Sequence, residues 1–211
     1  MSEQVLDFFA GVTTVPVVVI DDVRHALPLG RALAAGGIPC AEITLRTPSG
    51  LAAVEALAAL PGFRVGAGTV LDEKQARAAV DAGADFLVSP GFDDGVWRVG
   101  RETGVPVVPG TTTATEVQRA VNAGAGLVKF FPAVAAGGIP ALRALSEPFG
   151  AVRFMPTGGV RPDDASAWLA EPAVLAVGGS WLAPRDLLRA GRFDEITRIA
   201  RATTRDVVTR T

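Results

Sequence analysis

The sequence repeats one local pattern along its length: a short apolar run, a segment with helical spacing, and a turn containing glycine or proline. Continuous apolar runs rich in β-branched residues, such as residues 15–20, are typical of strands buried on both faces. Eight such strand–helix units within 211 residues match the number and size of a (β/α)8 barrel. We therefore expect one α/β domain, residues 1–211, folded as a single (β/α)8 TIM barrel with a short N-terminal helix.

The boundaries of the units follow from the turn residues. The expected strands are residues 15–20, 40–45, 64–67, 85–88, 106–108, 127–130, 152–155 and 174–177. The expected helices are residues 2–11, 23–35, 51–60, 72–81, 96–102, a segment starting at residue 113, residues 139–146, a segment starting near residue 162, and closing segments within residues 186–208. A doubly wound dinucleotide-binding fold fits less well, because Asp21 and Asp22 follow the first strand where a glycine-rich turn would be needed.

Composition excludes several classes of function. A formal charge of −2 leaves no basic surface for nucleic acid, and no apolar stretch approaches the ~20 residues that cross a bilayer. The acidic N-terminal residues do not resemble a secretory signal, so we expect a soluble, cytoplasmic protein. Cys40 and His25 are the only residues of their types, which rules out an intrachain disulfide and zinc sites built on cysteines or on two histidines. We expect no metal and no cofactor.

Lys129 is the most unusual residue of the chain. It is one of two lysines, against eighteen arginines, and it lies within an apolar run that we expect to be a buried strand. A buried amine loses part of its preference for the charged form and becomes a usable nucleophile, which arginine cannot do. The alternative is a lysine that extends to solvent or pairs with a buried carboxylate. The strand context alone leaves both interpretations open.

The second expected strand ends in a group of polar residues. Alternation places Glu42 and Thr44 on one face, and Arg46 follows two positions later. The carboxyl ends of barrel strands carry the functional groups of such folds. Glu42 could transfer protons there, and Arg46 could bind a substrate carboxylate through its paired donors. A purely structural ion pair is the alternative.

Paired glycines follow the seventh and eighth expected strands, in Pro156-Thr157-Gly158-Gly159-Val160 and Val177-Gly178-Gly179-Ser180-Trp181. These are the strands after which a barrel commonly surrounds a phosphate with backbone N–H groups. Glycines needed only for chain reversal would explain either pair, but would explain their coincidence poorly.

Together these motifs resemble the 2-keto-3-deoxy-6-phosphogluconate (KDPG) and 4-hydroxy-2-oxoglutarate (KHG) aldolases, the Schiff-base pyruvate aldolases of the Entner–Doudoroff pathway. The resemblance covers nearly the whole chain and rests on the segments 42–47 (EITLRT), 65–70 (VGAGTV), 89–91 (SPG), 128–133 (VKFFPA), 156–160 (PTGGV) and 178–181 (GGSW). The main departure is Thr111-Thr112-Thr113, where the family more often has a mixed Ile/Ser/Thr stretch.

The resemblance implies the following roles. Lys129 would attack the C2 ketone of the substrate and form a protonated imine, while Glu42 would carry protons during imine formation and C3–C4 cleavage. The products would be glyceraldehyde 3-phosphate and pyruvate. Arg46 and Thr69 would hold the carboxylate, and Pro90 and Phe131 would shape the pocket. The phosphate would be bound by the second glycine-rich group, namely Thr157, Gly158, Gly159, Gly179 and Ser180.

The family also suggests a homotrimer. Two alternatives keep the mechanism and change the substrate to 4-hydroxy-2-oxoglutarate or to 2-dehydro-3-deoxy-6-phosphogalactonate. Two others keep only the barrel: a phosphosugar isomerase or synthase without a covalent intermediate, and a non-catalytic sugar-phosphate binder. Neither of these last two needs a buried lysine.

Overall fold

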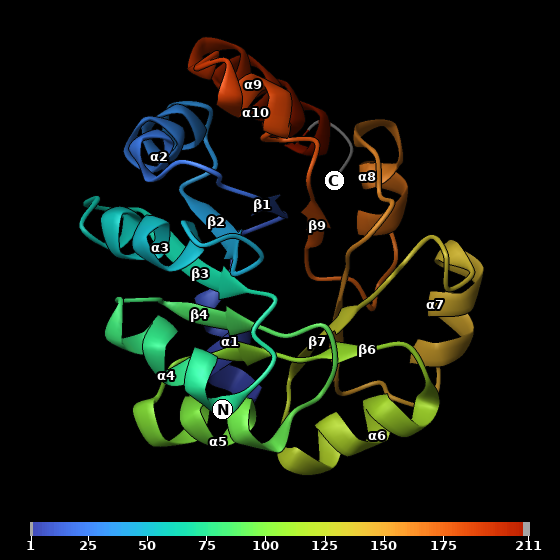
Figure 1. Ribbon diagram of the computed structural model, residues 1–211. Helices are drawn as coiled ribbons and strands as arrows, with labels where there is room; N and C mark the ends of the chain where they lie inside the picture. Colours follow the sequence, from blue (N-terminus) through green and yellow to red (C-terminus); the bar gives the residue numbers. More distant parts are fainter. Residues whose placement is uncertain (1, 209–211) are drawn as a thin grey trace.

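The computed structural model describes residues 2–208 and alternates strands with helices throughout (Figure 1). The strands are Thr14–Val18 (β1), Cys40–Thr44 (β2), Arg64–Gly68 (β3), Phe86–Val88 (β4), Val107–Val108 (β5), Gly110–Thr111 (β6), Leu127–Phe130 (β7), Arg153–Pro156 (β8) and Val177–Gly179 (β9). The helices are Ser2–Phe8 (α1), Ala26–Ala35 (α2), Gly50–Ala58 (α3), Glu73–Asp81 (α4), Asp94–Thr103 (α5), Ala114–Ala123 (α6), Gly138–Ser146 (α7), Pro162–Leu169 (α8), Arg185–Arg189 (α9) and Phe193–Val208 (α10). A short 3₁₀ helix, Val23–His25 (η1), precedes α2.

All the paired strands run parallel, and the sheets curl so that the helices surround them (Figure 1). Hydrogen bonds join the strands as a sheet of six, in the order β5-β4-β3-β2-β1-β9, and a sheet of three, in the order β6-β7-β8. One parallel bridge, from Thr157 just after β8 to Gly178 of β9, connects the two sheets. The described strands therefore form a curled parallel α/β fold, and the expected continuous ring of eight is met only in part.

Most strands differ from the expected bounds by only one or two residues, but two segments differ more. Residues 106–108 were expected as one strand, but the segment contributes β5 and then β6, separated by Pro109, which has no N–H group to donate. The last expected strand, residues 174–177, lies instead at Val177–Gly179, and Val174 makes only an isolated bridge to Phe154. Short strands at a seam have few ladder hydrogen bonds, so apolar residues alone do not fix where pairing begins.

Local sequence signals mark the start of α6 and the end of α1. Thr113 precedes α6, and it forms the expected capping box with Glu116, in which each side chain bonds to the other residue's backbone N–H. The N-terminal helix ends at Phe8, three residues before the expected end, and the chain turns at Gly11, where φ is 75°. Glycine adopts this left-handed conformation without the strain that other residues would incur.

Helix α1 packs over the amino ends of β3 and β4. Phe9 is almost fully buried, and its ring meets Phe86, the first residue of β4, edge to face at 5.2 Å. Phe8 lies 5.7 Å from the same ring and beneath the Arg64 guanidinium. These contacts belong to one connected apolar core. Because α1 covers the amino ends of these strands, their carboxyl ends are the side left for a site.

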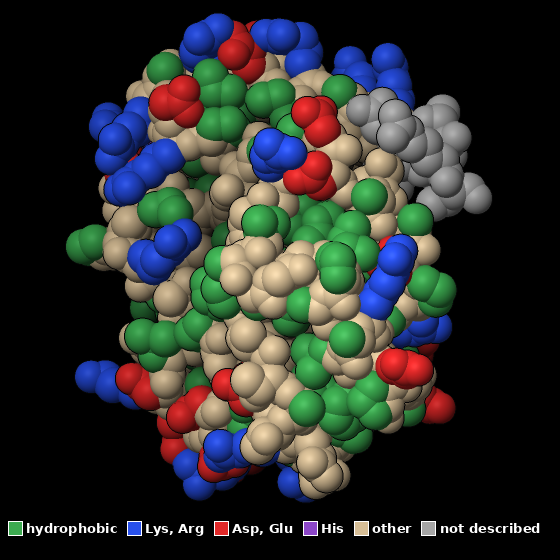
Figure 2. Space-filling view, turned by 90° about the vertical axis from the view of Figure 1, so that its right-hand side faces the viewer, with side chains coloured by type: hydrophobic (Ala, Val, Ile, Leu, Met, Phe, Trp, Pro, Cys, Tyr) green, Lys and Arg blue, Asp and Glu red, His purple; other side chains and the backbone are tan. Residues whose placement is uncertain are grey.

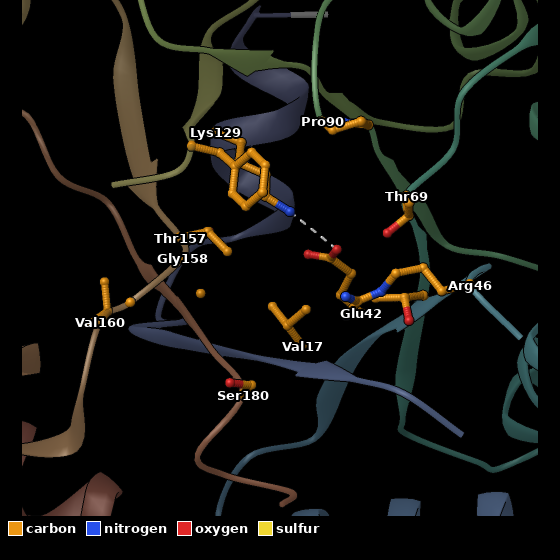
Figure 3. A pocket seen from close by; sticks show the side chains of 14 residues that line it. Val17, Glu42, Arg46, Thr69, Pro90, Lys129, Thr157, Gly158, Val160 and Ser180 are labelled. Atoms are coloured by element: carbon orange, nitrogen blue, oxygen red, sulfur yellow. Dashed lines mark hydrogen bonds and ion pairs between the residues drawn. The ribbon is translucent and has the colours of Figure 1, made fainter. Parts of the chain in front are cut away.

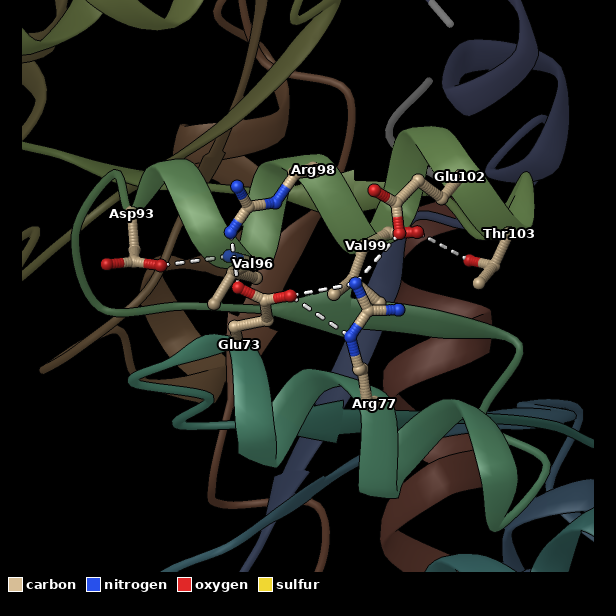
Figure 4. Close-up of polar contacts among 8 residues, drawn as sticks. All are labelled: Glu73, Arg77, Asp93, Val96, Arg98, Val99, Glu102 and Thr103. Carbon is tan, nitrogen blue, oxygen red and sulfur yellow. Dashed lines mark hydrogen bonds and ion pairs between the residues drawn. The ribbon is translucent and has the colours of Figure 1, made fainter.

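Outside the core, charged side chains connect neighbouring helices. Glu73 of α4 accepts hydrogen bonds from Arg77, at 2.7 Å, and from Arg98 of α5, and Arg77 also reaches Glu102 at 2.8 Å (Figure 4). The hydrogen bonds from Arg77 and Arg98 lower the pKa of Glu73. All four side chains are partly exposed, so the network positions α4 against α5 and contributes little to stability. Among residues 2–208, no helix has both the length and the apolar character of a membrane span.

Candidate active site

A cavity of about 270 Å³ opens at the carboxyl ends of the strands. Its walls come from segments far apart in the sequence, which the curled sheets bring together (Figure 3). The residues that line it are Val17, Glu42, Thr44, Arg46, Thr69, Pro90, Lys129, Phe131, Thr157, Gly158, Gly159, Val160, Gly178 and Ser180.

The amine of Lys129 and the carboxylate of Glu42 meet in the centre of this cavity. Lys129 Nζ lies 3.3 Å from Glu42 Oε1, and the two side chains are only 6% and 1% exposed. The ammonium also lies 5.2 Å from the centre of the Phe131 ring. The second carboxylate oxygen, Oε2, is buried and accepts no hydrogen bond within the described chain. A buried polar atom without a partner is costly, so this oxygen is available to a water or a substrate hydroxyl.

Gly68 makes the space that Glu42 occupies. Adjacent strands β2 and β3 pair in register, with Thr44 opposite Gly68. A Cβ atom at position 68 would lie 2.1 Å from Glu42 Oε1 and 2.4 Å from its Cγ, closer than such atoms approach. The glycine at the end of β3 therefore determines where the catalytic candidate on β2 can place its carboxylate.

Arg46 and Thr69 lie together on one side of Glu42 (Figure 3). Arg46 is exposed, and its guanidinium makes no hydrogen bond or ion pair with the described residues. Thr69 has φ of 58°, a left-handed conformation that is strained for a β-branched residue. Such strain is typical of sites where the backbone must aim a side chain, and here the hydroxyl is placed beside an unpaired cation.

The loop that carries Arg46 is fixed by hydrogen bonds to its neighbours. The Leu45 N–H donates to the Gly68 carbonyl at 2.8 Å, and the Thr47 hydroxyl donates to the Ile20 carbonyl at 2.5 Å. The Ser49 hydroxyl donates to the Asp21 carbonyl at 2.8 Å. Three bonds within five residues hold this segment against β1 and β3, so the guanidinium projects from a rigid support.

The glycine-rich segments form the opposite wall. Thr157, Gly158 and Val160 lie across the cavity from Arg46 (Figure 3). Gly158 and Gly159 have φ of 96° and 83°, consecutive left-handed residues that expose the backbone to the cavity. Successive backbone N–H groups in such turns can form anion-binding concavities.

Ten of the eleven predicted site residues line this cavity, and Gly179 does not. A Cβ atom at Gly179 would lie 1.8 Å from the Trp181 ring, so packing explains this glycine. The neighbouring Gly178 lines the cavity instead, where a Cβ atom would meet Thr157 Oγ1 at 2.2 Å. Of the glycine pair that follows the eighth expected strand, Gly178 thus lines the cavity and Gly179 does not.

Four lining residues were not among the predicted site residues: Val17, Thr44, Val160 and Gly178. Thr44 was recognised as inward-facing, and its hydroxyl donates to the Val18 carbonyl at 3.0 Å. Val17 pairs in register with Glu42, so strand alignment would have found it. No group of three or more His, Cys, Asp or Glu side chains that could hold a metal ion occurs in residues 2–208.

Comparison with known proteins agrees with this arrangement. A family model described as KDPG and KHG aldolase matches residues 7–199. The chain belongs to this family. The KHG/KDPG aldolase of Escherichia coli K12 is 44% identical over 188 residues, which cover 89% of this chain and 88% of that protein. The similarity to this KHG/KDPG aldolase therefore extends over most of the length of both chains.

Solved structures of this aldolase family have the same fold. The Legionella pneumophila KDPG aldolase, captured with pyruvate as a covalent carbinolamine intermediate, superposes with a TM-score of 0.90 and 39% identity, covering 96% of this chain and 98% of that one. The Zymomonas mobilis enzyme with 3-phosphoglycerate has a TM-score of 0.86 and 38% identity, covering 94% and 95%.

Gly68→Ala tests how Glu42 is positioned. We expect a folded aldolase whose turnover falls on the order of 10–100-fold, because the added methyl group displaces the Glu42 carboxylate from Lys129. Turnover and the thermal melting temperature measure the two effects separately. Gly150→Ala is the matched control, since a Cβ atom there meets nothing within 4 Å. Equal turnover of the two variants would show that Gly68 does not position Glu42.

Proposed function

We propose that this protein is a Schiff-base aldolase that reversibly cleaves 2-dehydro-3-deoxy-6-phosphogluconate to pyruvate and glyceraldehyde 3-phosphate. The observation that carries the proposal is the buried contact between Lys129 Nζ and Glu42 Oε1, with Oε2 free of any partner in the described chain. An amine nucleophile beside a carboxylate in a cavity is the arrangement that imine chemistry requires.

Imine formation comes first. Glu42 takes a proton from the Lys129 ammonium, the neutral amine attacks the C2 carbonyl carbon, and Glu42 passes that proton to the carbonyl oxygen to give a carbinolamine with a protonated nitrogen. Glu42 then takes a proton from this nitrogen and gives it to the hydroxyl, which departs as water and leaves a protonated imine. The free oxygen of Glu42 can hold a water, so the same carboxylate can serve both transfers.

Cleavage then uses the imine as an electron sink. Glu42 takes the proton of the C4 hydroxyl, and the electrons of the C3–C4 bond move toward the protonated imine. Glyceraldehyde 3-phosphate leaves, and a pyruvate enamine remains on Lys129. Protonation at C3 by Glu42 regenerates the imine, and hydrolysis releases pyruvate and the free amine, so the enzyme returns to its starting state.

The walls of the cavity suit the two ends of this substrate. Arg46 and Thr69 lie on one side of the Lys129–Glu42 contact, and Thr157, Gly158 and Val160 lie on the other (Figure 3). A C2 ketone at Lys129 would place the adjacent carboxylate toward the Arg46 guanidinium and the distant phosphate toward the glycine-rich wall. Pro90 and Phe131 would border the reacting atoms, and Ser180 would add a hydroxyl at the phosphate end.

The relatives support both ends of this orientation. The Legionella enzyme holds pyruvate covalently as a carbinolamine, and the Zymomonas enzyme holds a phosphorylated three-carbon acid. The family name also includes KHG aldolase, and the Escherichia coli relative carries both names. A second substrate of this protein is therefore 4-hydroxy-2-oxoglutarate, which has a carboxylate where the first has a phosphorylated chain.

We also propose that the strands act as one (β/α)8 barrel comprising a single domain, with β5 and β6 filling one strand position. The Lys129 N–H bonds to the Pro109 carbonyl at 2.8 Å, between β5 and β6, which supports this assignment. The Thr157–Gly178 bridge supports closure on the other side. A crystal structure in which either seam is open to water would contradict it.

Trapping with borohydride tests the nucleophile. Incubation with pyruvate followed by reduction should leave a stable pyruvyl adduct on the peptide that contains Lys129, measured by mass spectrometry. Lys129→Arg should give no adduct, because the guanidinium stays protonated. Lys74 is an internal control, since it is exposed on α4 and should remain unmodified. A folded, active enzyme without an adduct at Lys129 would rule out the imine mechanism.

Glu42→Gln tests the proton carrier. The substitution keeps the shape of the side chain and removes its basicity, so we expect the fold to persist and turnover to fall by about 10²–10⁴-fold. Near-normal turnover would reduce Glu42 to a structural partner of Lys129. Melting temperature provides the check that the loss is chemical.

Ser180→Ala tests the phosphate end. Loss of the hydroxyl should raise KM for the phosphorylated substrate roughly 3–10-fold, the effect of one hydrogen bond, and leave KM for 4-hydroxy-2-oxoglutarate unchanged. Both constants come from steady-state assays of pyruvate release. An equal rise for both substrates would place Ser180 away from the phosphate.

We propose a homotrimer on the basis of the family resemblance. On the side of the molecule that carries α7 and α8, acidic and basic side chains gather toward the edges, and the centre is mostly neutral and hydrophobic (Figure 2). Val134, in the segment between β7 and α7, is 48% exposed. Light scattering should give about three times the chain mass of 21.7 kDa. A mass equal to one chain would contradict the trimer.

A further inference from the structure

A second cavity lies at the other end of the strands. It has a volume of about 360 Å³ and is enclosed by the connection between α1 and β1, the connection between α2 and β2, the first residue of β3 and one residue of α10. The lining residues that matter below are Val12, Thr14, Ile38, Cys40 and Arg64. None of the residues that line it is acidic.

Arg64 is the one charged residue among the described residues that line this cavity, and none of them neutralises its charge. The side chain is half-buried, and its Nη1 donates to the Phe8 carbonyl while the guanidinium stacks over the Phe8 ring at 5.1 Å. Among the side chains that the structure describes, residues 3–205, no carboxylate lies within ion-pair distance of it, and its Nε and Nη2 groups have no acceptor. A partly buried guanidinium with unused donors favours an anion as its partner.

Thr14 provides an independent observation. It is only 4% exposed, and its hydroxyl has no hydrogen-bond partner among the described residues. The Thr14 carbonyl is already used, since the Cys40 thiol donates to it at 3.9 Å. A buried hydroxyl without a partner is costly, and an oxygen atom within the cavity would satisfy it.

The remaining walls are neutral and largely apolar. Val12, Ile38 and Cys40 are buried, and burial raises the pKa of the Cys40 thiol to about 12, so it stays uncharged. The cavity therefore combines one unneutralised cation, one unsatisfied hydroxyl and an apolar surface.

We propose that this cavity binds a small organic carboxylate with a short apolar chain. The carboxylate oxygens accept hydrogen bonds from the free guanidinium donors of Arg64, and an oxygen of the ligand accepts the Thr14 hydroxyl proton. The apolar chain packs against Val12 and Ile38. A ligand of this class therefore matches the charge of Arg64, the hydrogen-bonding capacity of Thr14 and the apolar walls of the cavity.

This site is separate from the aldolase centre. On β1, Thr14 lines the second cavity and Val17 lines the first. On β2, Cys40 lines the second cavity and Glu42 lines the first. Arg64 begins β3, and Thr69 follows its other end. The proposal does not rest on the proposed function, because none of its residues takes part in the imine chemistry.

Calorimetric titration with butyrate at constant ionic strength tests the proposal. Butyrate has no ketone and cannot form an imine with Lys129. We expect saturable binding to the wild-type protein, weakened about 10-fold or more by Arg64→Met and roughly 3–10-fold by Thr14→Val. Arg31→Met is the matched control, since Arg31 is exposed on α2 and lines neither cavity, and it should leave butyrate binding unchanged. Arg46→Met removes the carboxylate partner of the first cavity, and it should keep the binding component that Arg64→Met weakens. The neutral analogue 1-butanol should bind far more weakly.

Several results would overturn the proposal. These are the absence of saturable binding at millimolar butyrate, binding lost in Arg46→Met and kept in Arg64→Met, and equal binding of butanol. Circular dichroism shows whether each variant is folded. If Arg64→Met does not fold, Thr14→Val decides, because it keeps the shape of the side chain and removes only the hydroxyl; unchanged affinity in that variant would then reject the site.

Discussion

The buried contact between Lys129 and Glu42 constrains the arrangement of the whole site. Two ionisable groups removed from water are stable only where geometry and neighbours compensate for the lost hydration. That requirement explains features on adjacent strands: Gly68 leaves room for the carboxylate, and the Phe131 ring lies beside the ammonium. The contact also leaves Glu42 Oε2 without a partner among the residues that the structure describes, which a purely structural ion pair would not need. The arrangement is better suited to proton transfer than to stability.

Much of the fold could be predicted because the spacing of apolar residues along the chain indicates which faces of the helices and strands are buried. The parallel strands, the surrounding helices and the capping box at Thr113 all follow from local pattern. The seams could not be predicted in this way. The chain pairs again as β6 after Pro109, beyond the end of the expected strand 106–108, and β9 begins at Val177, the last residue of the expected strand 174–177. Register at these places depends on a few long-range hydrogen bonds.

The site shows the same division between local and long-range information. Lys129 and Glu42 stood out from residue type and strand position, and the structure places them 3.3 Å apart. The choice between Gly178 and Gly179 was beyond local reasoning. It depends on Trp181, whose ring occupies the space beside Gly179, and on Thr157, which lies against Gly178 from another strand. The two adjacent glycines thus differ in their access to the cavity because different side chains pack against them.

The two ends of the strands use positive charge in different ways. Eighteen of the twenty cationic residues are arginine, so a lysine at position 129 is a departure from the usual choice of this chain. Arg46 and Arg64 keep a permanent charge, which suits binding of an anion at either end. Lys129 lies buried in the same cavity as Arg46, where a nitrogen that can lose its proton is chemically useful. The choice of cation therefore separates binding from covalent chemistry within a single set of strands.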